Sequence, residues 1–184
     1  MIALINYKKM NTPTFDCWTF TSIVSNRVLN SIVNDSAIFK WGLTEGKRTD
    51  KNYRIWMNNY DTKSFKQICS IFDSNQTKSM FSNIVETDLT RCRTRIELCK
   101  DKEGSWLHNH YDDPAKLFTL QLYLTESSTS TSFGNESSNA KLGHGWFFRN
   151  TARELHGLPE LPKKRISIIV NYVDDTWRDG SVLV

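Results

Sequence analysis

The chain has 184 residues, of which 39% are hydrophobic and 24% are charged, and its formal net charge at pH 7 is +4. These values are typical of a soluble globular protein, and the length favours a single domain over residues 1–184 with a buried core. No apolar run approaches the ~20 residues that a membrane span requires, which excludes a membrane-spanning protein. The N-terminal residues do not follow the order of a secretory signal, and the four cysteines form no CxxC pair. We therefore expect a cytoplasmic protein with reduced thiols.

In the first half of the chain, the spacing of the apolar side chains is mainly helical, with short strands between the helices. The expected elements are a strand at 15–20, a helix at 22–34, a strand around 53–57, and helices at 62–72 and 79–86. Thr62 or Ser64 is the expected N-cap of the second helix, because its side-chain oxygen can accept a hydrogen bond from a free backbone N–H. This half of the chain carries no motif that we can match.

After residue 90 the apolar period changes from about 3.6 to 2, which predicts strands. The clearest strand is 117–125, with leucines and a phenylalanine on one face and Thr119, Gln121 and Tyr123 on the other. A last long strand is expected at 165–173. We therefore expect every ordered segment between residues 91 and 173 to be a strand.

Helices followed by strands favour an α+β fold, in which a helical support region, 1–90, lies against a β-sandwich or barrel, 91–173. One segment of the second half, 126–141, is rich in Ser, Thr and Asn and has few apolar side chains. Such a segment cannot offset the entropy of its own ordering by burial, so we expect a mobile loop.

Two histidines and one aspartate stand beside these strands in a pattern typical of a metal site. His110 and Asp112 are two residues apart just before the strand 117–125, and His156 lies before the last strand. Two imidazoles and one carboxylate that leave coordination positions open are the donor set of a non-haem iron(II) site. We therefore predict that His110, Asp112 and His156 are metal ligands and carry the catalysis.

Arg165 follows His156 by nine residues and opens a strand. Its guanidinium can bind a carboxylate with two parallel donors, and the phenol of Tyr123 can stand beside it. With these residues in order, the sequence resembles the iron(II)- and 2-oxoglutarate-dependent dioxygenases, whose fingerprint is H-x-D, a distant H and then R. The likeness covers roughly residues 91–173.

The resemblance implies a double-stranded β-helix, a jelly-roll or cupin-like barrel, buttressed here by the N-terminal helices. It also implies that Arg165 pairs with the distal carboxylate of 2-oxoglutarate. The prolyl hydroxylases are most similar, because their H-x-D is also followed by a strand ending in Tyr-Leu, here Tyr123-Leu124. In them the tyrosine hydroxyl bonds the same carboxylate, and Ser167, at the common R-x-S position, is expected to add a hydrogen bond.

The cofactors implied by the resemblance are Fe(II), 2-oxoglutarate as co-substrate and O2, and the family admits ascorbate as an addition. The implied reaction is hydroxylation with release of succinate and CO2. The intact Asp112 favours hydroxylation over halogenation, since halogenating members have a small residue at that place. The substrate is left open between a peptidyl side chain, with proline first, and a small molecule or sugar.

Other interpretations of the same residues have weaker support. His108 and His110 form the H-x-H pair of a cupin site, but the glutamate that this family needs a few residues later is absent. The alternating Arg91, Arg93 and Arg95 are expected to be a solvated or substrate-facing row, and a nucleic-acid partner is not expected. Oxidative demethylation of nucleic acid also ranks low, because Asn171 stands where such enzymes carry a second arginine. A catalytically silent β-sandwich binding module remains the alternative from another class.

Overall fold

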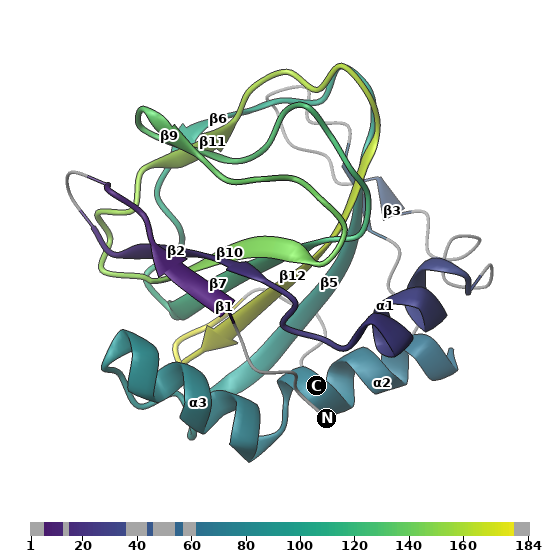
Figure 1. The fold of residues 1–184 in the computed structure, drawn as a ribbon. Coiled ribbons are helices and arrows are strands. Elements are labelled where there is room, and N and C mark those ends of the chain that lie inside the picture. Colours follow the sequence, from purple (N-terminus) through teal and green to yellow (C-terminus); the bar gives the residue numbers. More distant parts are fainter. Residues whose placement is uncertain (1–5, 13–14, 36–43, 46–53, 57–61, 179–184) are drawn as a thin grey trace.

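The computed structural model describes residues 6–12, 15–35, 44–45, 54–56 and 62–178. Its described strands form two antiparallel sheets, which face each other in Figure 1. The larger sheet has the order β1 (Asn6–Lys9), β2 (Cys17–Thr21), β10 (His144–Arg149), β7 (Lys116–Tyr123), β12 (Arg165–Val173), β5 (Arg93–Asp101), β4 (Arg54–Trp56) and β3 (Thr44–Glu45). The smaller sheet has the order β6 (Leu107–His110), β11 (His156–Leu158), β8 (Ser132–Phe133) and β9 (Glu136–Ser137).

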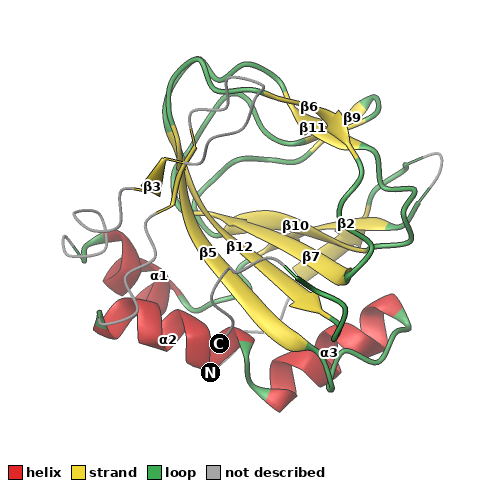
Figure 2. Ribbon diagram, turned by 180° about the vertical axis from the view of Figure 1, so that it is seen from behind, coloured by secondary structure: helices red, strands yellow, loops and turns green. Residues whose placement is uncertain are grey.

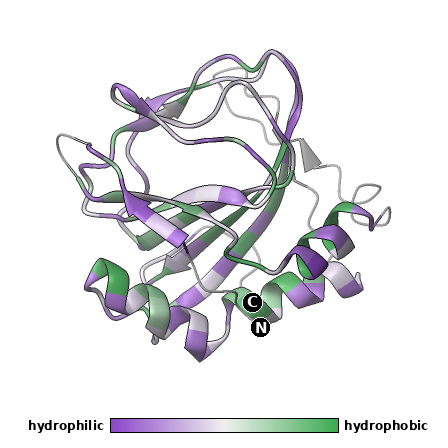
Figure 3. Cartoon of the chain, viewed as in Figure 1, coloured by the Kyte–Doolittle hydropathy of each residue, from purple (hydrophilic) through white to green (hydrophobic). Residues whose placement is uncertain are grey.

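Three helices lie on the side of the larger sheet that faces away from the smaller one (Figure 2): α1 (Asn26–Val33), α2 (Lys63–Phe72) and α3 (Asn75–Val85). Each begins after a hydroxyl N-cap, Ser25, Thr62 and Ser74 respectively, whose side chain accepts a hydrogen bond from a backbone N–H in the first turn. Hydrophilic and hydrophobic residues alternate along each helix (Figure 3), as expected for helices with one buried face. No helix in the described ranges has the length and apolar character needed to cross a bilayer.

Apolar and polar side chains alternate along β7, so one face of the larger sheet is apolar and the other is polar. Phe118, Leu120 and Leu122 are fully buried and belong to the main hydrophobic core, together with apolar residues of all three helices. Thr119 and Gln121 point the other way and line a cavity between the two sheets. We call the cavity side of the larger sheet its inner face.

The predicted α+β class agrees with these mostly antiparallel sheets and few helices. The helix predicted at 62–72 is confirmed, with Thr62 as its cap. The helix predicted at 79–86 begins earlier in the structure, at Asn75. The prediction missed the first turn because that turn is polar and shows no apolar period. The strand predicted around 53–57 is present as β4, although residues 53 and 57 lie outside the described residues.

Residues 1–90 are not only a helical support, since β1 and β2 extend one edge of the larger sheet and β3 and β4 extend the other. β2 pairs with β10, which lies far along the chain, and β4 pairs with β5. The sequence predicts the strands β2 and β4, but their pairing with distant partners does not follow from a local period.

Segment 126–141 also differs from the expected mobile loop. It forms the hairpin of β8 and β9, and Thr131, Phe133 and Ser138 within it are buried. The hydroxyls of Thr131 and Ser138 both contact the phenol oxygen of Tyr123. The expectation of a mobile loop is therefore wrong, because the polar side chains of this segment supply hydrogen bonds for a buried hairpin.

Candidate metal centre and cavity

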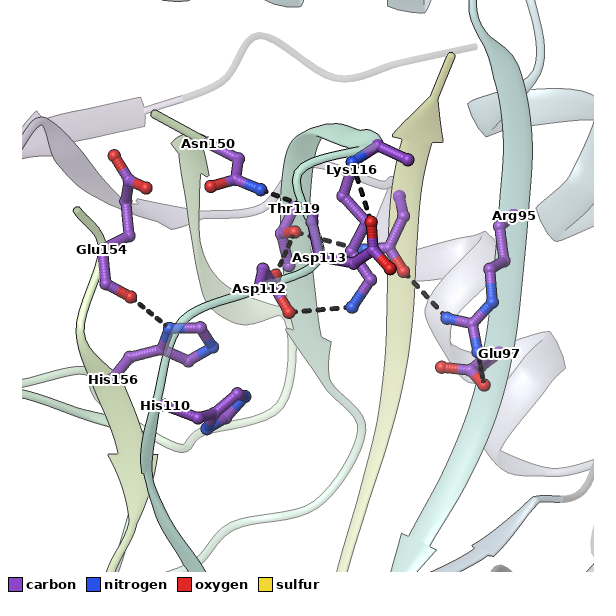
Figure 4. A network of polar contacts seen from close by, with 12 residues as sticks. Arg95, Glu97, His110, Asp112, Asp113, Lys116, Thr119, Asn150, Glu154 and His156 are labelled. Carbon is purple, nitrogen blue, oxygen red and sulfur yellow. Dashed lines mark hydrogen bonds and ion pairs between the residues drawn. The ribbon is translucent and has the colours of Figure 1, made fainter. Parts of the chain in front are cut away.

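His110 and His156 lie side by side on two neighbouring strands of the smaller sheet. They are register partners in β6 and β11, and their ring centroids are 4.4 Å apart. Nδ1 of His110 lies 3.0 Å from the carbonyl oxygen of His108. Nδ1 of His156 lies 2.7 Å from the carbonyl oxygen of Glu154, a contact that Figure 4 shows. A carbonyl only accepts, so each Nδ1 carries a proton and each Nε2 is the nitrogen that is left to face a metal. This arrangement of the second nitrogen is usual for histidines that bind a metal.

Asp112 follows β6 and turns its carboxylate toward the two imidazoles (Figure 4). Nζ of Lys116 lies 2.8 Å from Oδ1, and Oγ1 of Thr119 donates to Oδ2 at 2.7 Å. Burial alone raises the pKa of Asp112, but the charges of Lys116 and His156 and the two hydrogen bonds bring it down to about 2. The carboxylate is therefore ionised at neutral pH and available to a cation.

Burial lowers the pKa of His156 below its usual value, and the opposing attraction of Asp112 does not cancel this effect. His156 is thus neutral at pH 7, which is the form that binds metals. One ligand atom each from His110, Asp112 and His156 lies within 4.8 Å of the other two. The structure therefore brings together the three side chains expected at a metal site, and this donor set fits iron(II) with positions left open.

The three side chains open into a cavity of about 140 Å³ between the two sheets. The cavity is lined from the larger sheet, the smaller sheet and the segment after β12 by Arg95, Glu97, Leu107, His110, Asp112, Lys116, Thr119, Gln121, Thr131, Trp146, His156, Gly157, Leu158, Arg165, Ile169, Asn171 and Trp177. Most of these side chains are polar or aromatic. The cavity therefore offers several hydrogen-bonding groups near the histidines.

Arg165 lines the same cavity and is 1% exposed. Its Nε and Nη2 donate to Oδ2 of Asp101 at 3.2 and 2.7 Å, and its guanidinium carbon lies 5.4 Å from the ring centre of Tyr123. Nη1 is buried and has no hydrogen-bond partner among the described residues. A buried donor without an acceptor costs free energy, so this atom is suited to an acceptor that enters the cavity.

Tyr123 and Ser167 lie on the inner face near Arg165 but are not among the residues that line the cavity. The hydroxyl of Tyr123 is 2.6 Å from Oγ of Ser138 and accepts from Nε1 of Trp146 at 3.1 Å. Oγ of Ser167 accepts from Nε2 of Gln121 at 2.8 Å. The structure thus brings His110, Asp112, His156 and Arg165 to one cavity, whereas Tyr123 and Ser167 support its wall.

Several cavity residues were missed in the sequence or interpreted only in part. Of the arginine row, Arg93 is exposed, but Arg95 is 9% exposed and faces the cavity with Glu97 and Asn171. Lys116 also lines the cavity and is bound to Asp112. The signal that can identify these residues is a polar side chain at an inner-face position of a strand whose other face is apolar.

The H-x-H pair of a cupin site is not assembled. His108 is exposed, does not line the cavity, and packs against Trp106 with ring centroids 4.2 Å apart. Within the described ranges, the group of side chains that can hold a metal contains His110 without His108.

Comparison with solved structures assigns the fold to the prolyl hydroxylase type. A prolyl-4-hydroxylase from Pseudomonas putida has a TM-score of 0.67 at 11% identity, over 86% of this chain and 92% of that one. A viral collagen prolyl hydroxylase from Paramecium bursaria Chlorella virus-1, solved with 2OG, has a TM-score of 0.58 at 18% identity, over 91% and 96%. A prolyl hydroxylase from Trichoplax adhaerens, in complex with a hypoxia-inducible factor peptide fragment, has a TM-score of 0.65 at 13% identity, over 86% and 84%.

At these identities the likeness shows the fold and leaves the activity to be argued from the site. It agrees with the resemblance to prolyl hydroxylases found in the sequence. No sequence family and no curated protein matches the chain.

Proposed function

We propose that this protein is an Fe(II)- and 2-oxoglutarate-dependent dioxygenase that hydroxylates an unactivated C–H bond of a peptidyl side chain, with proline as the first candidate. One observation carries the proposal. One cavity holds three ligand atoms within 4.8 Å of one another and also the buried Nη1 of Arg165, which has no hydrogen-bond partner among the described residues. A metal and an anionic co-substrate are what these two features would bind.

His110, Asp112 and His156 would hold the iron, because two imidazole nitrogens and one carboxylate oxygen form a donor set that iron(II) prefers. Arg165 would hold the distal carboxylate of 2-oxoglutarate through Nη1, which would then gain the acceptor that it lacks. When bound, Fe(II), 2-oxoglutarate and O2 supply the oxidation that converts C–H into C–OH and releases succinate and CO2. The chain itself binds and orients these groups and keeps the buried cavity from filling with bulk water.

Two further groups that line the cavity support an amide-containing substrate. Trp177 is 8% exposed and lines the cavity, and its Nε1–H has no acceptor among the described residues. The carboxylate of Glu97 lines the same region and can accept a hydrogen bond. A peptide bond offers the matching pair, a carbonyl for Trp177 and an N–H for Glu97. The bound peptide in the Trichoplax adhaerens structure is consistent with such a substrate on this fold.

The first test is anaerobic binding of Fe(II) and 2-oxoglutarate, followed by visible absorption, because their complex has a weak charge-transfer band. We expect the band in the wild type, its loss in His110→Ala, and a raised 2-oxoglutarate requirement in Arg165→Ala. Lys164→Ala is the matched control, since Lys164 precedes Arg165 and is exposed. A folded, metal-loaded wild type without the band would favour a binding module and overturn the proposal.

The second test identifies the substrate by succinate release under O2. Proline-containing peptides, free amino acids and sugars are compared at equal concentration with wild-type protein. Release stimulated by peptides alone is the expected result. Release stimulated only by a small molecule or sugar would retain the chemistry and reject the peptidyl substrate.

A further inference from the structure

A row of polar side chains crosses the inner face beside the metal site. Asn171 in β12 is the register partner of Arg95 in β5 on one side and of Thr119 in β7 on the other. All three side chains are buried, with exposures of 9% for Arg95, 0% for Asn171 and 4% for Thr119. The row ends at Asp112, one of the three side chains at the metal site, as Figure 4 shows for Thr119 and Asp112.

The hydrogen bonds along this row can run in only one direction. Nη1 of Arg95 donates to Oδ1 of Asn171 at 2.9 Å, and an arginine has no acceptor, so the amide oxygen must face it. Nδ2 of Asn171 then points to Thr119 and donates to its Oγ1 at 2.9 Å. The orientation of this amide therefore follows from the chemistry of Arg95.

The same logic fixes the proton of Thr119. Its oxygen accepts from Asn171, and its own O–H is left to donate to Oδ2 of Asp112 at 2.7 Å. The carboxylate of Asp112 accepts this bond, so the hydrogen bonds run in the same direction to this end of the row. Glu97 holds the other end of the row by accepting from Nη2 of Arg95.

We propose that Arg95 and Asn171 are positioning residues for the metal-binding carboxylate, and that they act through Thr119. The proposal rests on the proposed function only in requiring that Asp112 binds the metal. Thr119 holds Oδ2 while Lys116 holds Oδ1, so the plane of the carboxylate is fixed from both sides. Without Asn171, the hydroxyl of Thr119 regains rotational freedom and its donation to Asp112 weakens.

A role confined to packing does not account for this row. Buried inner-face positions of this kind can be filled by apolar side chains, whereas a buried polar row is stable only when every member is satisfied. Groups that orient a metal ligand typically change metal affinity by about 10–100-fold when they are removed. The row should therefore affect metal affinity separately from its effect on stability.

The test measures the dissociation constant of Co(II), a spectroscopic substitute for Fe(II), in full-length protein at fixed pH. We expect Thr119→Val to weaken Co(II) binding by about 10–100-fold, and Thr119→Ser to restore it because the hydroxyl is kept. Asn171→Leu should weaken binding less, in the same direction. Thermal unfolding of each metal-free variant reports stability independently.

The double variant Thr119→Val/Asn171→Leu decides whether Asn171 acts through Thr119. We expect its Co(II) affinity to equal that of Thr119→Val alone, because the second change then has no hydroxyl to act on. The double variant removes the amide that Thr119→Val alone would leave without its acceptor, but it also takes Oδ1 of Asn171 away from Nη1 of Arg95. Thermal unfolding of the metal-free double variant therefore has to show a cooperative transition before its Co(II) affinity is compared. Losses that multiply in the double variant would overturn the proposal.

Arg95→Met and Arg93→Met form a second, matched comparison on one strand. Arg93 is exposed and is not part of the row, so its variant should bind Co(II) like the wild type. Arg95→Met should weaken binding and change the Co(II) spectrum. If folded Arg95→Met and Asn171→Leu bind Co(II) as tightly as the wild type, the positioning role is rejected while the metal site stands. Failure of the wild type itself to bind Co(II) would reject both proposals.

Discussion

Asp101 accepts two hydrogen bonds from Arg165 on a single oxygen, Oδ2, and leaves Nη1 of the guanidinium unpartnered within the described part of the chain. The two residues are register partners in β5 and β12, so the sheet itself brings them together. Both are buried, at 0% and 1% exposure. Asp101 thus compensates the charge of Arg165 before any ligand binds, and one donor stays available to the cavity.

Asp101→Asn should lower the melting temperature of the ligand-free protein and increase the rise in melting temperature that 2-oxoglutarate causes. Loss of one partner from a buried ion pair costs about 3 kcal/mol or more, which corresponds to about 6–12 °C in melting temperature for a chain of this size. A bound carboxylate would replace the missing charge, so 2-oxoglutarate should raise the melting temperature more than in the wild type. Thermal unfolding with and without 2-oxoglutarate measures both effects.

The control for this prediction is Asp16→Asn. Asp16 pairs with Lys9 at the surface, where both side chains are more than half exposed, and such pairs contribute at most about 1 kcal/mol. A smaller response to 2-oxoglutarate in Asp101→Asn than in the wild type would mean that Asp101 serves mainly to orient Arg165.

Metal binding should stabilise the protein, and a chelator should reverse the effect. A metal present at one hundred times its dissociation constant stabilises the folded state by about 2.7 kcal/mol. We expect anaerobic Fe(II) or Mn(II) to raise the melting temperature of the wild type and of His108→Ala, whose histidine is exposed and outside the cavity. His110→Ala should show no rise. A lost response in His108→Ala would instead support the cupin arrangement.

The site could be predicted from the sequence to the extent that its residues flank strands of clear period. His110, Asp112 and Arg165 stand at the ends of runs that alternate apolar and polar side chains. The pairing of Arg165 with Asp101 could not be predicted, because it depends on the register between β5 and β12. The same is true of the contact between Asn171 and Thr119, which the period of either strand alone does not reveal.

The fold could be predicted where local signals were strong. The capped helix at 62–72 and the long strands after residue 90 follow from local spacing and N-cap chemistry. The edge strands β1 and β3 are only four and two residues long, and each is held by pairing with a neighbour. The burial of segment 126–141 involves partners outside the segment, such as the phenol of Tyr123 and the ring of Trp146, which the composition of the segment does not reveal.

Tyr172→Phe should lower stability although it removes only one oxygen. The hydroxyl of Tyr172 donates to the carbonyl of Phe72 at 2.7 Å and so joins β12 to the end of α2. Burial raises the pKa of Tyr172, so the group remains a donor at any moderate pH. The carbonyl left without its partner should cost about 1–3 kcal/mol, measured by urea unfolding. Tyr7→Phe, at a tyrosine that is 49% exposed, should change stability little, and equal effects would contradict the argument.

Tyr123→Phe separates two roles for this tyrosine. In the structure its hydroxyl contacts Ser138 and Thr131 of the hairpin and accepts from Trp146. Its removal takes the acceptor from the backbone N–H of Thr131 and reduces the number of hydrogen bonds that hold the hairpin, although Trp146 keeps its bond to Gln121. We expect a loss of about 1–3 kcal/mol and faster proteolysis within 126–141, with an unchanged 2-oxoglutarate requirement. Limited proteolysis and succinate release at varied 2-oxoglutarate concentration measure these effects.

Tyr111→Phe is the control for both measurements, because Tyr111 is 57% exposed and lies outside the cavity lining.

The resemblance to prolyl hydroxylases implies the opposite result for Tyr123→Phe. If its phenol holds the distal carboxylate beside Arg165, the 2-oxoglutarate requirement should rise while the hairpin keeps its resistance to protease. That outcome would require the hydroxyl to exchange its contact with Ser138 for the ligand when 2-oxoglutarate binds, because a 2.6 Å contact already occupies it.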